Sequence, residues 1–156
     1  MCNNHQIKKF SIAIGADHAG YDLKEFIAAE LRSAGHDVND FGTFSGAAID
    51  YPDIGKEVAE VVASGQFELG VLICGTGIGI TIAANKVKGI RAAVCSESFS
   101  ARMARAHNNA NILGLGARVV GHGLALEIVK AFFETEFEAG ARHERRVDKL
   151  NAMDKC

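Results

Sequence analysis

The sequence predicts an α/β fold with three layers, in which a five-stranded parallel sheet carries helices on both faces. Short apolar runs alternate along the chain with segments whose apolar residues recur every three or four positions, as in amphipathic helices. The apolar runs are nearly continuous, which is typical of parallel strands buried on both faces. With 156 residues, of which 48% are hydrophobic, we expect residues 1–156 to form a single domain with a substantial core.

Five strands are expected, at residues 10–15, 36–40, 69–74, 90–95 and 112–116. The first helix has an i, i+3, i+4, i+8 apolar pattern and is stopped by Gly35; its apolar residues are Leu23, Phe26, Ile27 and Leu31. A loop at 41–52 precedes the second helix, which ends at Gly65 and carries Ile54, Val58, Val61 and Val62. Three further helices are expected at about 80–86, at 99–107 and along a segment with Leu124, Ile128, Val129, Phe132 and Phe133.

The tail at 138–156 is more charged than the rest of the chain. Arg142 and Arg146 are four residues apart and so share a helix face, while Val147 and Leu150 are the main apolar anchors. Two interpretations stay open. The tail is either a solvated terminal helix or an arm whose two guanidinium groups bind a phosphate.

Composition excludes several classes of function. The net charge of −2, the absence of Trp and the lack of a basic stripe argue against a nucleic-acid partner. No apolar run reaches membrane length, and no secretory leader precedes Phe10. The six histidines include no pair at helical ligand spacing, so no metal is expected. The cysteines lack paired or metal-type spacing, which favours a reducing cytoplasm; they are Cys2, Cys74, Cys95 and Cys156.

The run from Val71 to Ile80 is the most informative motif. A buried strand ends in Cys74, and three alternating glycines then open a tight turn into a helix. Such a turn exposes backbone N–H groups at the helix N-terminus, where an anion or a thiolate is stabilised. Three known glycine loops do not fit. Ile80 occupies the position where a dinucleotide-binding fingerprint has its third glycine and where a cysteine phosphatase loop has arginine. The Gly-Lys-Ser/Thr sequence of a nucleotide-hydrolase phosphate loop is absent.

Ligands of parallel α/β sheets bind beyond the carboxyl ends of the strands. The residues at that edge include an acid, a thiol, a hydroxyl and a cation; they are Asp17-His18, Phe41-Gly42-Thr43, Cys74 to Gly79, Cys95-Ser96-Glu97 and Gly116-Ala117-Arg118. We expect all the functional motifs, those at His107 and Asn108 included, to converge on this one edge.

Five motifs occur in a characteristic order: Asp17-His18-Ala19-Gly20-Tyr21, Asp50-Tyr51-Pro52, Cys74-Gly75-Thr76-Gly77-Ile78-Gly79, His107-Asn108-Asn109-Ala110-Asn111 and Arg142-His143-Glu144-Arg145-Arg146-Val147. Together they resemble the family that holds type B ribose-5-phosphate isomerases and galactose-6-phosphate isomerase subunits. The resemblance extends from about Ile12 to Val147. It implies a Rossmann-like sheet and an aldose–ketose isomerisation through a cis-enediolate, without metal or cofactor.

The resemblance also implies a role for each matching residue. Cys74 would be the base, and Thr76 would assist proton movement between the two substrate oxygens. Gly75, Gly77 and Gly79 would hold the enediolate through their amides, and Asp17 and His107 would open the sugar ring. Asn108 and Tyr51 would contact sugar oxygens. The phosphate would be bound by His18, Arg118, Arg142 and Arg146.

The family forms dimers or tetramers whose sites use two chains. By this resemblance the tail at 138–156 packs on a partner subunit, and His107 and Arg142 lie across a two-fold axis from Cys74. Two departures from the family pattern are visible. Ala141 replaces a frequent glycine, and Ile80 stands where some members have a glutamate base, which leaves Cys74 as the candidate.

Two alternatives to a ribose 5-phosphate substrate stay open. One is the isomerisation of a related hexose 6-phosphate of the allose or galactose type, with loop 41–49 and the space near Ala16 and Phe44 setting the sugar length. The other is a non-catalytic module that binds a sugar phosphate or nucleotide on the same fold. The presence of Cys74, Thr76 and His107 argues against that module, since a binder needs no proton transfer.

Overall fold

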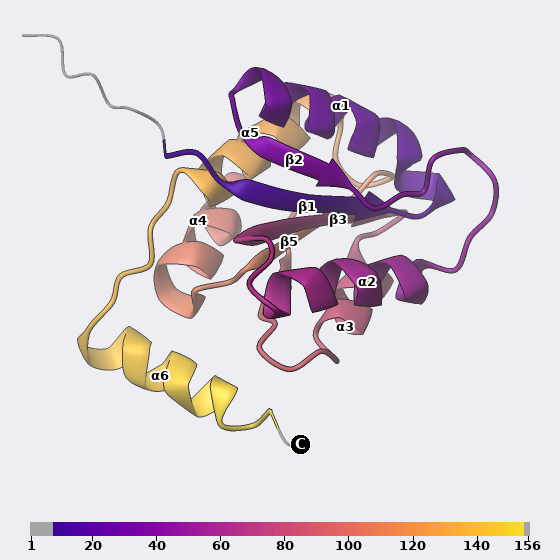
Figure 1. Cartoon of the computed structure of the whole chain (residues 1–156). Coiled ribbons are helices and arrows are strands. Elements are labelled where there is room, and N and C mark those ends of the chain that lie inside the picture. The colour runs from indigo at the N-terminus through magenta and orange to yellow at the C-terminus, as the bar shows by residue number, and fades with distance from the viewer. Residues whose placement is uncertain (1–7, 155–156) are drawn as a thin grey trace, which may run out of the picture.

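The computed structural model describes residues 8–154, whose five strands form one parallel sheet in the order β2-β1-β3-β5-β4 (Figure 1). The strands are β1 (Ser11–Ala16), β2 (Asp37–Asp40), β3 (Leu69–Cys74), β4 (Ala92–Val94) and β5 (Ile112–Gly116). The helices are α1 (Tyr21–Ser33), α2 (Tyr51–Ala63), α3 (Ile78–Ala84), α4 (Ser98–Asn108), α5 (His122–Phe133) and α6 (Ala141–Asn151), and a short 3-10 turn, His18–Gly20, precedes α1.

Each face of the sheet has its own apolar core. Helices α1, α4 and α5 cover one face, where Ile27, Ala101 and Phe132 pack with strand residues such as Ile14. Helices α2 and α3 cover the other face, where Val58 and Ile80 are fully buried. The central strand β3 is buried along its whole length, which explains its uninterrupted apolar sequence. The predicted three-layer α/β class is therefore confirmed.

The predicted elements are all present, with some ends displaced. The loop predicted to reach residue 52 is shorter, because Tyr51 and Pro52 already belong to α2; proline is tolerated in the first turn, where no intrahelical N–H bond is needed. Strand β4 is shorter than the predicted 90–95. The backbone N–H of Arg91 donates to the side chain of Asn111 at 2.8 Å instead of joining the strand ladder.

Helix α4 carries its last residues away from the carboxyl edge of the sheet. It begins just after β4 ends and runs back alongside the sheet, and its 11 residues span about 16 Å. Asn108 therefore lies at the amino edge, where its carbonyl accepts a hydrogen bond from Nε of Arg91, the residue just before β4, at 3.2 Å. The prediction that all the functional motifs lie at the carboxyl edge of the sheet is therefore wrong for a single chain.

Helix α6 lies outside the three layers. In Figure 1 it forms the yellow helix below α4, on the side away from the arrowheads of β1 and β2. It packs on α4, and Val147 is buried, whereas Leu150 is 42% exposed, so one of the two predicted anchors is only partly covered. Among the described helices, none is both long and apolar enough to cross a membrane. Cys2 and Cys156 lie outside the described residues.

Candidate active site

The thiol of Cys74 is held against the glycine-rich loop that follows β3. Its side chain is only 5% exposed, and its Sγ atom accepts a hydrogen bond from the backbone N–H of Gly77 at 3.1 Å. The carbonyl of Cys74 accepts from the backbone N–H of Ala117 at 2.9 Å, which ties the end of β3 to the segment after β5. The amide of Gly77 thus holds the sulfur at the start of the loop, and a thiol must lose its proton before it can act as a base or nucleophile.

Two of the loop glycines are needed for close packing. Gly77 has a φ of 77°, and a β-carbon there would lie 2.7 Å from the carbonyl carbon of Leu115. A β-carbon on Gly79 would lie 2.7 Å from the ring of Tyr51, so the tyrosine ring packs directly against the loop. The glycines thus bring β5 and the start of α2 against the residues that follow Cys74.

The remaining loop positions point to solvent. Thr76 is exposed, and its Oγ1 accepts from the backbone N–H of Ile78 at 3.3 Å, at the start of α3. Arg118 follows β5 and is exposed. Its guanidinium group lies beside Gly75, since a β-carbon added to that glycine would be 3.3 Å from Nη1. A hydroxyl and a guanidinium group therefore flank the thiol, as the sequence predicted.

Asp17 and His18 follow β1, the neighbour of β3. The backbone N–H of Asp17 donates to the carbonyl of Ile73 at 3.1 Å, which places this acid beside the end of β3. The Asp17 carboxylate is buried and accepts from the N–H groups of Ala19 and Gly20 at 3.0 and 3.1 Å. His18 is exposed, and its Nδ1 accepts from the N–H of Ile49 at 3.4 Å.

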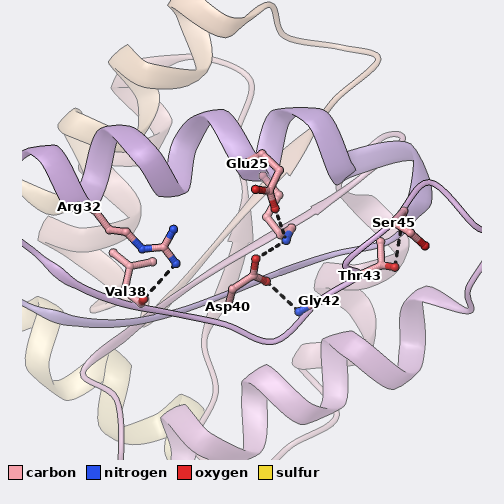
Figure 2. A network of polar contacts seen from close by, with 8 residues as sticks. Glu25, Arg32, Val38, Asp40, Gly42, Thr43 and Ser45 are labelled. Atoms are coloured by element: carbon pink, nitrogen blue, oxygen red, sulfur yellow. Dashed lines mark hydrogen bonds and ion pairs between the residues drawn. The ribbon is translucent and has the colours of Figure 1, made fainter.

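A buried lysine, which the sequence analysis did not single out, fixes the loop beside Asp17. Figure 2 shows the network around the fully buried Lys24 of α1, whose Nζ donates to Glu25 at 2.7 Å and also pairs with Asp40. The other oxygen of Asp40 accepts from the N–H of Gly42 at 2.8 Å. Thr43 then donates from its backbone to the carbonyl of Ala16 at 2.6 Å. The entry to loop 41–50 is thus bound to the end of β1.

A second group of predicted residues lies at the amino edge. His107 is half-buried and Asn108 is exposed at the end of α4. Arg142 and Arg146 are exposed on α6, which packs against α4. A cavity of about 370 Å³ lies here, between α6 and the residues around β4, and Asn108 lines it.

The fold therefore divides the predicted residues into two sets. The set at the carboxyl edge, called the thiol set below, comprises Asp17, His18, Tyr51, Cys74, Gly75, Thr76, Gly77, Gly79 and Arg118. The set at the amino edge, called the α4–α6 set, comprises His107, Asn108, Arg142 and Arg146. The second free cysteine of the described residues is Cys95, and burial and the nearby Glu97 raise the pKa of its thiol to about 11. It remains a protonated thiol at neutral pH.

The sheet and its thiol loop define an α/β protein with a cysteine at the carboxyl edge, and comparison with known proteins identifies its kind. Residues 12–150 match the Ribose/Galactose Isomerase family. The chain belongs to this family, so it is a sugar isomerase, and the resemblance expected from the five motifs is confirmed.

Individual relatives are similar over nearly their full length. The chain is 50% identical over 143 residues to ribose-5-phosphate isomerase B of Escherichia coli, covering 92% of this chain and 95% of that protein. It is 43% identical over 147 residues to galactose-6-phosphate isomerase subunit LacB of Clostridium acetobutylicum, covering 92% and 85%. The solved structure of Clostridium thermocellum ribose-5-phosphate isomerase B superposes with a TM-score of 0.90 at 56% identity, covering 92% and 96%.

Proposed function

We propose that this chain interconverts ribose 5-phosphate and ribulose 5-phosphate through a cis-enediolate, with Cys74 as the base. The observation that carries this proposal is the hydrogen bond from the Gly77 amide to the Cys74 sulfur, at the edge where parallel α/β sheets bind ligands. A reducing cytoplasm, which keeps Cys74 a free thiol, is the compartment we propose for it.

The isomerisation moves one proton between two adjacent carbons. The thiolate of Cys74 takes the proton from C2 of the open-chain aldose, and the electron pair of that C–H bond forms the C1–C2 double bond as O1 gains negative charge. Thr76 assists the transfer of a proton between O2 and O1, and the thiol then returns its proton to C1, which gives the ketose. Backbone amides that face the developing oxyanion typically contribute ~3 kcal/mol each. The loop amides of Gly75 and Gly79 are the donors we assign to this task. The Gly77 amide, to which the resemblance gave the same task, donates to the Cys74 sulfur instead.

A complete site needs two copies of the chain. Since the thiol set and the α4–α6 set lie at opposite edges, we propose that His107, Asn108, Arg142 and Arg146 serve the Cys74 of a partner subunit. The arginines bind the phosphate together with His18 and Arg118, while Asn108 and Tyr51 contact sugar oxygens. Because a two-fold axis repeats each contact, two such sites form at once.

An exposed apolar patch beside Cys74 supports this pairing. Its members come from α3, the edge strand β4 and the start of α4, and they are Ile78, Ile82, Val94 and Phe99, 43–65% exposed. The patch is continuous with the thiol loop, because a β-carbon on Gly77 would lie 2.8 Å from the side chain of Val94. Exposed apolar patches of this kind mark protein–protein interfaces. We infer that a second copy docks on this face with its α4–α6 set toward the loop, which would give a homodimer or a tetramer of two dimers.

Ring opening precedes isomerisation, because ribose 5-phosphate is mostly a cyclic furanose. One group must accept the proton of the anomeric hydroxyl, and another must protonate the ring oxygen as the bond from C1 to that oxygen breaks. We assign these tasks to Asp17 and to His107 of the partner. Histidine suits the task, since it exchanges a proton near neutral pH.

A second candidate is an isomerase of a hexose 6-phosphate. The similarity to a galactose-6-phosphate isomerase subunit supports this alternative, and we assign the choice of sugar length to loop 41–49, where Phe44 is exposed. A purely binding module has less support, because Cys74 and Thr76 are both in place.

A coupled assay of the purified protein tests the proposal. We expect the highest kcat/KM with ribose 5-phosphate, against allose 6-phosphate and galactose 6-phosphate, and the same activity in the presence of a chelator. A preference for either hexose phosphate would favour the second candidate. Activity lost on chelation and restored by a divalent metal would contradict the metal-free mechanism.

A further inference from the structure

Two histidine rings stack face to face where α6 meets α4. The rings of His107 and His143 have centroids 4.2 Å apart and planes only 7° apart. His107 is half-buried at the end of α4, whereas His143 is 8% exposed and lies on the side of α6 that faces the rest of the protein. His143 belongs to the last sequence motif, yet the proposed reaction gives it no task.

The contacts of His143 show which protonation state it holds. Its Nε2 lies 3.3 Å from Nε of Arg142, which can only donate a hydrogen bond, and 3.8 Å from a carboxylate oxygen of Glu138. Only the shorter contact is within hydrogen-bond distance, so Nε2 acts as an acceptor and the ring is neutral. Burial, together with the positive charges of Arg142, Arg146 and a protonated His107, lowers the pKa of His143, and Glu138 only partly opposes this.

Glu138 is held in this group by the backbone. Its N–H donates to the carbonyl of Ala106, the residue before His107, at 2.9 Å. The segment between α5 and α6 is thereby fixed to the end of α4. This contact sets the position from which α6 starts and so brings His143 over the ring of His107.

The same three side chains could be considered as metal ligands. The ligand atoms of His107, Glu138 and His143 all lie within 4.8 Å of one another. However, imidazole lone pairs lie in the ring plane, and two parallel stacked rings direct them side by side rather than toward one point. The guanidinium groups of Arg142 and Arg146 nearby further disfavour a cation. The stacked arrangement therefore favours a role in holding the His107 ring.

We propose that His143 is a positioning residue for sugar-ring opening: its neutral ring fixes the orientation of His107 and adds no charge against the proton that His107 must carry. This inference rests on the proposed function, in which His107 takes part in ring opening. It extends that function by one residue, and it explains why the buried face of a charged helix carries a histidine.

Proton exchange separates enediolate formation from ring opening. Ribulose 5-phosphate has no free hydroxyl at C5, so it remains an open-chain ketone and needs no ring opening before Cys74 removes its C1 proton. The equilibrium constant fixes the ratio of kcat/KM in the two directions, so a defect in ring opening lowers both. It leaves the exchange of the C1 proton of ribulose 5-phosphate with deuterium from the solvent nearly unchanged.

The experiment compares His143→Ala, which removes the stacked ring, with His143→Phe, which keeps a flat neutral ring. We expect His143→Ala to lower kcat/KM for ribose 5-phosphate by on the order of 10- to 100-fold, as for a misplaced acid or base. Its rate of C1 proton exchange in ribulose 5-phosphate should change by less than about threefold, well below that range. His143→Phe should recover most of the loss. With excess His143→Ala enzyme, the forward rate should level off at the rate of uncatalysed ring opening.

The controls separate this inference from the proposal beneath it. His122→Ala removes a histidine that packs edgewise on Phe26, away from this group, and should keep wild-type kinetics in both directions. His107→Ala should likewise lose conversion of ribose 5-phosphate while it keeps the C1 proton exchange of ribulose 5-phosphate. If His107→Ala behaves in this way and His143→Ala does not, or if His143→Phe is no better than alanine, the positioning role is wrong. If His107→Ala loses proton exchange as well, the ring-opening assignment itself fails, and the inference fails with it. An inactive wild-type protein would instead refute the proposed substrate.

Discussion

The backbone nitrogen of Gly77 lies 3.1 Å from the Sγ atom of Cys74, and this nitrogen belongs to a residue whose φ is 77°. A β-carbon at Gly77 would also lie 2.7 Å from the backbone of Leu115 in β5. The hydrogen-bond partner of the thiol is thus a position that only glycine fills without strain. The reactivity of Cys74 and the packing of two central strands depend on the same residue.

Replacing Gly77 with alanine should therefore damage stability and activity together. The left-handed backbone and the contact with Leu115 should lower the free energy of unfolding by on the order of 1–3 kcal/mol, and kcat should fall as the amide moves from the sulfur. Gly89→Ala is the matched control, because Gly89 also has a positive φ but open space around it. Thermal melting and steady-state kinetics measure both effects. Equal behaviour of the two variants would show that the contact with Leu115 is unimportant.

Cys74→Ala should abolish isomerisation and leave substrate binding nearly intact, since the thiol acts on a C–H bond and holds little of the substrate. We expect kcat to fall by about 10³-fold, within the range for loss of a general base, with the affinity for a phosphate-bearing inhibitor unchanged. Cys95→Ala is the control and should keep wild-type turnover, because Cys95 is a buried, protonated thiol. Turnover of Cys74→Ala within a few-fold of wild type would exclude Cys74 as the base.

Arg142→Ala and Arg146→Ala should mainly weaken substrate binding. A charge-assisted hydrogen bond to phosphate contributes on the order of 1.5–3 kcal/mol, which corresponds to roughly a 10- to 150-fold rise in KM. The fall in kcat should be smaller. Arg145→Ala removes another exposed arginine from the same helix and serves as the control. If all three variants match the wild type, α6 is a solvated helix without a role in binding.

Mixing two variants that are each impaired with ribose 5-phosphate tests whether the site is shared. Chains with Cys74→Ala and chains with His107→Ala should form heterodimers that hold one site with both groups and one with neither. Random pairing makes half of the dimers mixed, each with one of two sites intact, so roughly a quarter of wild-type activity should return. Subunit exchange is verified by mass spectrometry with one chain isotope-labelled. Activity that stays at the level of the parents despite exchange would place each site within one chain.

Much of the fold could be predicted from the sequence because burial patterns are local. Continuous apolar runs such as 69–74 and the spacing of Leu23, Ile27 and Leu31 each predict an element and the face that it buries. The ends of the elements were predicted less well. Helix α2 begins before the predicted loop ends, where Tyr51 packs on Gly79. Strand β4 begins later than predicted, where the Arg91 N–H donates to the side chain of Asn111. Both are long-range contacts.

The thiol set was likewise predictable, because the residues after parallel strands must share one edge of the sheet. The α/β class, the family and the candidate base therefore follow from the sequence alone. The remaining features depend on how the helices pack. The antiparallel return of α4 carries His107 to the opposite edge, and α6 folds back to place His143 on the His107 ring. These relationships arise from the direction and packing of whole helices, so no local spacing of residues in the sequence encodes them.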